Sequence, residues 1–289
     1  MTRTNYSTAL VLAMTVMVVL SACGTSETEP TPQPTSAEQT RGADMGFTSI
    51  AALGDSMSLG VNACDTQGAC PEVSWVVGSD TAVQSLAERA TAITGGEVET
   101  TLAASDGASS ASMPEQANEV LKDKPALVTM LVGANDACRP KLEEMTPTAD
   151  FAANVTSALG TLSTGLPDAV IYVASVPNLP QLYAVGSADP TARAVWGGSK
   201  SCNSLLFQRD PTVAEGDARR AAVGARVAEY NAALEAACVP LANCVWDGGA
   251  TNAVVFGIDD LSQIDYFHAG ISGQKDLADV AWAALSSRG

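Results

Sequence analysis

The sequence reads Phe47-Thr-Ser-Ile-Ala-Ala-Leu-Gly54-Asp55-Ser56-Met-Ser-Leu-Gly60 where an apolar run meets a small polar turn. The run at 47–53 stops at Gly54, which is the pattern of a buried strand. A serine that follows a strand next to glycine can be held on a sharp turn with its hydroxyl exposed. A serine hydroxyl is a poor nucleophile unless a base lies within hydrogen-bond reach. Gly-Asp-Ser alone is a common turn, so the case for Ser56 as a nucleophile depends on the rest of the chain.

Segments typical of strands and helices alternate along the chain. Apolar runs that predict further strands lie at 98–103, 126–132, 169–176 and 253–258. Apolar residues at helical spacing predict helices at 80–94, 114–122, 150–162, 218–237 and 273–286. Residues 185–217 are rich in Gly, Asp, Pro and Ser and predict a long irregular insertion. This order predicts a three-layer α/β/α sandwich with a mostly parallel sheet and a site at the carboxyl ends of the strands.

His268 is the only histidine of the chain. A lone histidine is more often a packed or surface residue than a catalytic one. This one follows a predicted strand and stands three residues after Asp265. A carboxylate at that spacing can bind the second ring nitrogen, fix its tautomer and stabilise the imidazolium. Any Ser–His chemistry in this chain must use His268, so Ser56, His268 and Asp265 form a candidate catalytic triad.

Two other strand ends carry groups that suit a developing negative charge. Gly107 follows the predicted strand 98–103, and Asn135 follows 126–132 in Gly133-Ala-Asn-Asp136. The backbone N–H groups of Ser56 and Gly107, with the side-chain amide of Asn135, would form an oxyanion hole. Each residue alone could be an ordinary loop glycine, turn residue or helix cap. Their order at successive strand ends favours a catalytic site.

Taken together, these blocks resemble the SGNH (GDSL-like) hydrolase family over about residues 47–282. The four residues that name the family are matched here by Ser56, Gly107, Asn135 and His268, and Asp265 matches the third triad member. The resemblance implies a flavodoxin-like sandwich and serine esterase or lipase activity, without a metal or an organic cofactor. Trp196 and Phe207 of the insertion are expected to shape the acyl or alcohol pocket.

Two positions depart from the pattern of the family. Asp106 stands immediately before Gly107, where the family often has serine, and could place a carboxylate near the oxyanion hole. Ala269 follows the histidine, where the family usually has proline. We expect the second departure to change only the stiffness of the loop.

Six cysteines lie in the predicted domain, at 64, 70, 138, 202, 238 and 244. An even number in an exported chain indicates disulfides, and six cysteines allow fifteen pairings. A metal site is the alternative, which the lack of a Cys-x-x-Cys pair disfavours. The resemblance extends to actinobacterial secreted esterases and lipases of the family, whose three disulfides join near neighbours. It implies the pairs Cys64–Cys70, Cys138–Cys202 and Cys238–Cys244, and we expect these bridges to hold loops of the site rather than the sheet.

The N-terminal segment resembles an export signal. In residues 1–22 Arg3 is the only charge, and the apolar run Ala9 to Leu20 is shorter than the about 20 residues of a membrane-spanning helix. Leu20-Ser-Ala-Cys23 resembles a bacterial lipobox, which implies cleavage before Cys23 and its lipidation; an ordinary secretory signal is the alternative. Residues 23–43 predict a flexible tether, and 44–289 the hydrolase domain. We expect an exported monomer, anchored by lipid to the outer face of the cell membrane or released from it.

Composition limits the partners. The chain has 15 Lys and Arg against 32 Asp and Glu, a formal charge of −17 that repels nucleic acid. The predicted function is hydrolysis of short- or medium-chain carboxylic esters, because an aromatic content of 5% and the lack of a long apolar lid segment disfavour a long-chain lipase. Two alternatives stay open: a deacylase of a cell-envelope glycan or glycolipid, and a non-catalytic binding lipoprotein on the same scaffold.

Overall fold

The structure, a computed structural model, describes residues 45–64, 66–199 and 202–288. The predicted signal peptide, Cys23 and the tether lie outside these residues. Within the described part of the chain, no helix has the length and apolar character needed to cross a membrane.

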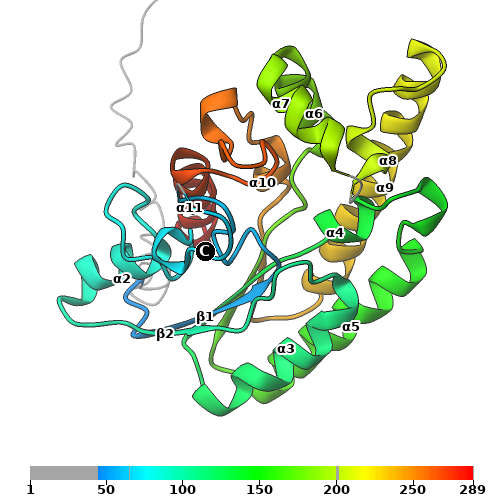
Figure 1. Cartoon of the computed structure of the whole chain (residues 1–289). Coiled ribbons are helices and arrows are strands. Elements are labelled where there is room, and N and C mark those ends of the chain that lie inside the picture. Colours follow the sequence, from blue (N-terminus) through cyan, green and yellow to red (C-terminus); the bar gives the residue numbers. More distant parts are fainter. Residues whose placement is uncertain (1–44, 65, 200–201, 289) are drawn as a thin grey trace, which may run out of the picture. The chain divides into compact units, whose positions relative to one another are not determined.

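A parallel sheet lies at the centre of the described domain (Figure 1). Its strands are β1 (Ser49–Gly54), β2 (Glu99–Leu102), β3 (Leu127–Leu131), β4 (Val170–Val173) and β5 (Cys244–Trp246). The order β2-β1-β3-β4-β5 is the flavodoxin-like order. Ile50 pairs with Leu127, which pairs with Val170, so the carboxyl ends of these parallel strands lie at the same end of the sheet. The predicted α/β class is confirmed.

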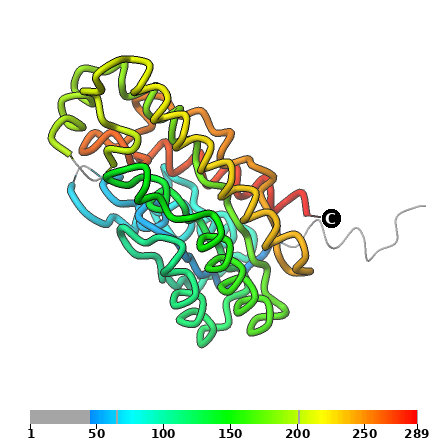
Figure 2. The backbone as a smooth tube through the Cα atoms, turned by 90° about the vertical axis from the view of Figure 1, so that its right-hand side faces the viewer, coloured from blue at the N-terminus to red at the C-terminus, as the bar shows by residue number. Residues whose placement is uncertain are grey.

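Helices cover both faces of the sheet (Figure 1). One face carries α3 (Met113–Val120), α5 (Thr148–Gly165) and α9 (Val213–Cys238), and the other α2 (Leu86–Thr94) and α11 (Ile271–Ser286). Figure 2 shows α9, in yellow and orange, running beside the green α5, and Phe151 of α5 stacks on Tyr230 of α9 with ring centroids 4.1 Å apart. Burial on both sides explains why β3 is apolar except at Thr129 and buried at every residue.

Short helices follow the strands at the carboxyl edge. They are α4 (Ala134–Ala137), α6 (Leu179–Ala188), α7 (Pro190–Gly198), α8 (Asn203–Leu206) and α10 (Ala250–Ala253). Turns of 3-10 helix lie at Pro71–Val73, Ser110–Ser112, Leu121–Asp123, Leu142–Glu144 and Ile258–Asp260. In Figure 1, α6, α7 and α8 stand beyond the sheet edge, above the ends of the strands.

The prediction of an irregular insertion at 185–217 was wrong, because most of its described residues are helical. Asp189 accepts hydrogen bonds from the main-chain N–H groups of Thr191 and Ala192, and Pro190 occupies the first turn, so α7 has a strong start. Position 186 of α6 requires glycine, because a Cβ there would lie 2.2 Å from the ring of Trp196.

Two other element predictions need correction. The strand predicted at 253–258 does not form: the range runs from the last residue of α10 to the first residue of a 3-10 turn, and Val255 between them is 77% exposed. The outermost strand of the sheet on this side is β5, which ends at Trp246. His268 therefore follows a turn and not a strand. The helix predicted from residue 80 starts at Leu86, because Gln84 adopts a left-handed φ of 53° and Ser85 forms a capping box with Glu88.

Three disulfides are present among the described residues, and they follow the pairing that the resemblance implies. Cys64 bonds to Cys70, Cys138 to Cys202, and Cys238 to Cys244. The second ties α4, which carries Asn135, to the start of α8. The third joins the end of α9 to the first residue of β5, at the end of the strands opposite to the turns that carry Ser56 and Asn135. The expectation that all three hold loops of the site is therefore wrong for Cys238–Cys244.

Candidate active site

Ser56 stands directly after β1, on a turn that the sequence constrains tightly. Gly54 has φ 132°, and a Cβ on it would lie 2.2 Å from the carbonyl oxygen of Leu131, so the position requires glycine. The amide of Gln116 binds the main chain of Gly54 on both sides, accepting from its N–H at 2.7 Å and donating to its carbonyl at 2.9 Å. These contacts fix the turn that carries the Ser56 hydroxyl.

A chain of hydrogen bonds runs from Ser56 through His268 to Asp265. The Oγ of Ser56 lies 2.8 Å from Nε2 of His268, and Nδ1 of His268 lies 2.5 Å from Oδ2 of Asp265. With the ring proton on Nδ1, the imidazole donates to the carboxylate and can accept the serine proton at Nε2. The structure thus brings together the three residues that the sequence predicts as a triad.

Asp265 is a well-supported carboxylate. Its Oδ1 accepts the main-chain N–H groups of Phe267 at 2.9 Å and His268 at 3.0 Å, and its Oδ2 also accepts the side-chain amide of Asn62 at 2.6 Å. Burial acts to raise the pKa of Asp265. The hydrogen bond and charge of His268, with the Asn62 amide, outweigh burial and lower this pKa to about 2.

The turn that carries Asp265 and His268 is held from two sides. Ala269 pairs with Leu261 in an isolated antiparallel bridge, and the N–H of Ser262 donates to the His268 carbonyl at 2.8 Å. From the other side, the indole N–H of Trp196 donates to the main-chain carbonyl of Asp265 at 3.0 Å. Sequence reasoning missed this contact, as it missed that of Asn62. An asparagine or tryptophan in a loop has no motif of its own, although Asn62 lies only two residues after the Gly60 that closes the serine block.

The predicted oxyanion residues face the same cleft as the triad. Asn135 lies in the short helix α4 just after β3. Its Nδ2 donates to the carbonyl of Ala108 at 2.9 Å, which leaves the second amide hydrogen for a ligand. Gly107 lies on the turn after β2 with φ 72°. Together with Ser56 and His268, both residues line a cleft with a volume of about 390 Å³.

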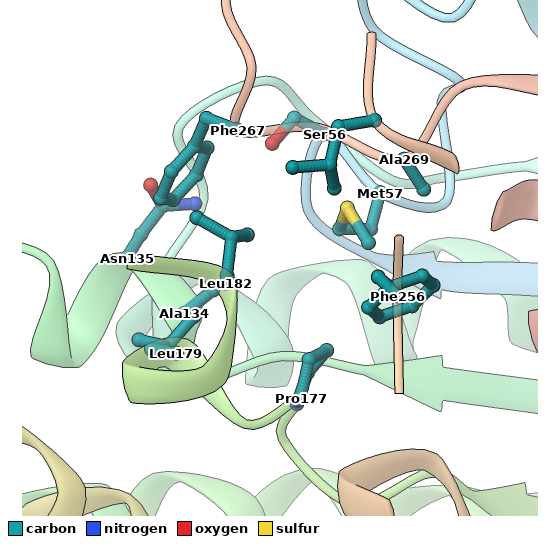
Figure 3. Close-up of a pocket in the computed structure, with 11 residues that line it drawn as sticks. Ser56, Met57, Ala134, Asn135, Pro177, Leu179, Leu182, Phe256, Phe267 and Ala269 are labelled. Atoms are coloured by element: carbon teal, nitrogen blue, oxygen red, sulfur yellow. The ribbon is translucent and has the colours of Figure 1, made fainter. Parts of the chain in front are cut away.

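A second, much smaller pocket, with a cavity volume of about 20 Å³, lies on another side of Ser56 (Figure 3). Its walls are almost entirely apolar and include Met57, Ala134, Pro177, Leu179, Leu182, Phe256, Leu261 and Ala269. Polar atoms come from Ser56 and Asn135, while Phe267 lines both this pocket and the cleft. Figure 3 shows the apolar side chains around the space next to the Ser56 hydroxyl.

Three expectations about neighbouring residues can now be placed. Ala269 lines the apolar pocket, so this departure from the family pattern affects pocket shape and not only loop stiffness. Asp106 is exposed and lines the cleft next to Gly107. Trp196 also lines the cleft, whereas Phe207 lies against the guanidinium of Arg219, 5.7 Å from its ring centroid.

Asp55, next to Ser56, is fully buried. Its Oδ1 accepts the main-chain N–H of Met57 at 3.0 Å, while its Oδ2 has no hydrogen-bond partner among the described residues. Burial is the main cause that raises the pKa of Asp55 to about 7, and the negative charges of Asp136 and Asp106 act in the same direction.

The family model of the GDSL-like lipases and acylhydrolases matches residues 52–275, from the last part of β1 to the first turn of α11. The chain belongs to the GDSL-like lipase/acylhydrolase family. Membership confirms the resemblance seen in the sequence and makes the chain a hydrolase. The matched span includes every residue of the triad and of the predicted oxyanion hole.

Several solved structures of hydrolases are similar to this chain. LAE5, an alpha/beta hydrolase enzyme from the metagenome of Lake Arreo in Spain, is 15% identical, covers 83% of this chain and 97% of its own, and has a TM-score of 0.52. The extracellular lipase of Streptomyces rimosus is 16% identical with a TM-score of 0.46, over 82% of this chain and 99% of its own. The esterase EstA of a Pseudoalteromonas species is 14% identical with a TM-score of 0.45, over 82% and 96%. At 15% identity the likeness to LAE5 is one of fold alone. No curated protein matches the chain.

Proposed function

We propose that this GDSL-like hydrolase is a serine esterase for short- or medium-chain carboxylic esters. The observation that carries the proposal is the hydrogen-bonded series from Ser56 Oγ to His268 Nε2 and from His268 Nδ1 to Asp265, at 2.8 and 2.5 Å. A serine within reach of an oriented, carboxylate-bound imidazole is the arrangement that turns a weak nucleophile into an effective one.

In the first half of the reaction, the Ser56 oxygen attacks the ester carbonyl while His268 takes the hydroxyl proton at Nε2. Asp265 stabilises the imidazolium that forms. The carbonyl oxygen becomes negative and is met by the N–H groups of Ser56 and Gly107 and by the free amide hydrogen of Asn135. His268 then gives its proton to the departing alcohol, which leaves an acyl group on Ser56. Water, activated by the same imidazole, releases the acid.

The two pockets suit the two parts of an ester. The leaving oxygen must lie within reach of His268, because this residue protonates it, and His268 lines the larger cleft and not the apolar pocket. The alcohol part therefore belongs in the cleft and the acyl chain in the apolar pocket. The smaller volume of that pocket, with Met57 and Phe256 among its walls, supports short or medium acyl chains.

An acyl-length series tests the proposal. The purified chain is assayed with p-nitrophenyl esters from acetate to laurate, with Ser56→Ala as a folded control of equal charge. We expect hydrolysis by the parent that is strongest below the longest chains and absent in Ser56→Ala. Equal rates for parent and Ser56→Ala would contradict the proposal, and a maximum at laurate would contradict the chain-length part.

We also propose that Cys23 carries a lipid that holds the enzyme at the outer face of the cell membrane, through the tether 23–43. The Leu20-Ser-Ala-Cys23 sequence supports this. After expression in a bacterial host that processes lipoproteins, the parent should sediment with membranes and Cys23→Ala should be found in the soluble fraction. Equal sedimentation of both forms would contradict the anchor.

A further inference from the structure

The side chain of Asn62 joins the loop that follows the nucleophile to the acid of the triad. Its Nδ2 lies 2.6 Å from Oδ2 of Asp265, the same oxygen that receives the Nδ1–H of His268 at 2.5 Å. Asn62 stands six residues after Ser56, whereas Asp265 lies at the other end of the domain sequence. One amide thus connects the segments that supply the nucleophile and the base.

Asn62 is itself held in a fixed position. Its backbone is left-handed, with φ 57°, a conformation that asparagine adopts more readily than most residues. Its N–H donates to the Gly68 carbonyl at 2.7 Å, and its Oδ1 accepts the Gly68 N–H at 2.8 Å. Its carbonyl accepts the hydroxyl of Ser262 from the acid-bearing segment. Because Gly68 holds Oδ1 of the side chain, the amide keeps its Nδ2 directed at Asp265.

We propose that Asn62 is a positioning residue of the triad. It orients the Asp265 carboxylate and, beside His268, stabilises the negative charge of that carboxylate. The inference rests on the proposed function of the triad. Its physical basis is that Oδ2 accepts from two donors. When one donor is removed, the carboxylate becomes a stronger acceptor for the imidazole and favours its protonated form. The base should then hold its proton to a higher pH, and the carboxylate should be less well oriented.

Other charges near the imidazole do not replace this contribution. The buried Asp55 interacts electrostatically with His268, and Asp106 lines the same cleft. Both groups are acids, as is Asp265 itself. Among the described residues that line the cleft, none is lysine or arginine. No lysine or arginine of the cleft lining would therefore offset, at His268, an additional negative charge at position 62.

Three variants separate positioning from a merely structural role. Asn62→Asp keeps an oxygen that can accept from Gly68 but replaces the donor to Asp265 by a like charge. Asn62→Gly keeps the left-handed backbone and removes the whole amide. Gln84→Gly is the matched control, since Gln84 is exposed, has a left-handed φ of 53° and lies on the entry to α2, away from the site.

The direct readout is an NMR titration of the imidazole, which is unambiguous because the chain has one histidine. We expect the titration midpoint to rise by about one pH unit in Asn62→Asp, by less in Asn62→Gly, and not at all in Gln84→Gly. The acid limb of the kcat/KM profile should move with it. At neutral pH, kcat should fall by about tenfold to a hundredfold in Asn62→Asp, with little change in KM.

The titration also separates this inference from the proposed function, because it needs no substrate. A midpoint in both Asn62 variants equal to that of Gln84→Gly would overturn the positioning role, even in an active esterase. If Asn62→Asp does not fold, Asn62→Gly carries the test with the same criterion. If the midpoint shifts in the Asn62 variants but the parent protein hydrolyses no ester, the positioning role is supported and the esterase proposal is refuted.

Discussion

The indole N–H of Trp196 donates a 3.0 Å hydrogen bond to the main-chain carbonyl of Asp265. Trp196 lies on α7, in the segment between β4 and α9, and its side chain is 3% exposed. Its ring stacks on Tyr183 of α6 with centroids 5.8 Å apart. The helices above the sheet edge therefore contact the triad directly and do more than shape a pocket.

Trp196→Phe should keep most of the ring packing and remove this hydrogen bond. We expect kcat to fall by about tenfold with little change in KM, because the turn that orients His268 loses one of its supports. Trp282→Phe, in α11, is the control for loss of an indole. Steady-state kinetics on a soluble ester make the comparison, and equal kcat in the two variants would show that the Trp196 bond has no role in catalysis.

Asp265→Asn should lower kcat by about 10- to 10⁴-fold, since the variant can still bind the ring but loses the charge that stabilises the imidazolium. The exposed Asp259 supplies the control Asp259→Asn. An Asp265→Asn enzyme that matches the control would rule out an electrostatic role for this carboxylate.

The same variant has a stability consequence at acid pH. The folded pKa of Asp265, about 2, lies below the ordinary value of 3.8, so the ionised form stabilises the fold above about pH 4 and this contribution disappears as the pH falls through 2. We expect Asp265→Asn to be less stable than the parent by about 2 kcal/mol near pH 5, with the difference fading toward pH 2. Urea unfolding at the two pH values measures it, and a constant difference would contradict the assignment.

Asp55→Asn should show the opposite dependence. Asp55 has a folded pKa raised to about 7, so the unfolded chain loses this proton near pH 4 while the folded one keeps it, and the parent loses stability as the pH rises between these values. Asparagine does not titrate and keeps an oxygen for the Met57 N–H. The variant should therefore gain stability relative to the parent between about pH 4 and pH 8, by up to about 4 kcal/mol. The unfolding free energies of parent and variant are measured across this range. A difference between them that stays constant with pH would show that Asp55 does not titrate as described.

The sequence predicted the residues that meet at the cleft better than it predicted the elements around them. Ser56, Gly107 and Asn135 could be placed because each follows a strand or predicted strand, and parallel strands bring their carboxyl ends together. His268 was found because the chain has no other histidine, although the strand expected before it does not exist. The predicted strand at 253–258 contains Val254, Val255 and Phe256, of which only Phe256 is buried. An apolar run of this length does not distinguish a strand from a loop that lines a pocket.

What could not be predicted are the contacts between distant segments. The glycines and prolines of the insertion suggest irregular chain, yet Pro190 begins α7, and Gly186 makes room for Trp196. The contacts of Asn62 and Trp196 with Asp265 have no periodic signal, because they depend on how loops pack and not on local spacing. The burial of Asp55 is likewise a tertiary property, since the same Gly-Asp-Ser sequence could lie on an exposed turn.

The disulfides should differ in their effects. Cys138–Cys202 spans 64 residues and ties α4 to α8, so its removal by paired serine substitution should lower stability by about 4 kcal/mol and also lower kcat, since Asn135 lies on α4. Cys238–Cys244 spans 6 residues at the opposite end of the strands, and its removal should cost about 2 kcal/mol with kcat unchanged. Thermal unfolding and kinetics on both pairs test this. A larger loss of kcat from the second pair would contradict the placement of the first beside the site.

The central claim is that ester hydrolysis runs through the 2.8 Å contact between Ser56 Oγ and His268 Nε2. Its most direct test is kcat/KM on a soluble p-nitrophenyl ester for the parent, Ser56→Ala, His268→Ala and the double variant. Because the two residues act as a unit, each single substitution should remove nearly the whole rate, on the order of 10⁴- to 10⁶-fold, and the double should cost little more. If His268→Ala kept more than about a tenth of the parent rate, the chemistry would not use this histidine, and the chain has no other.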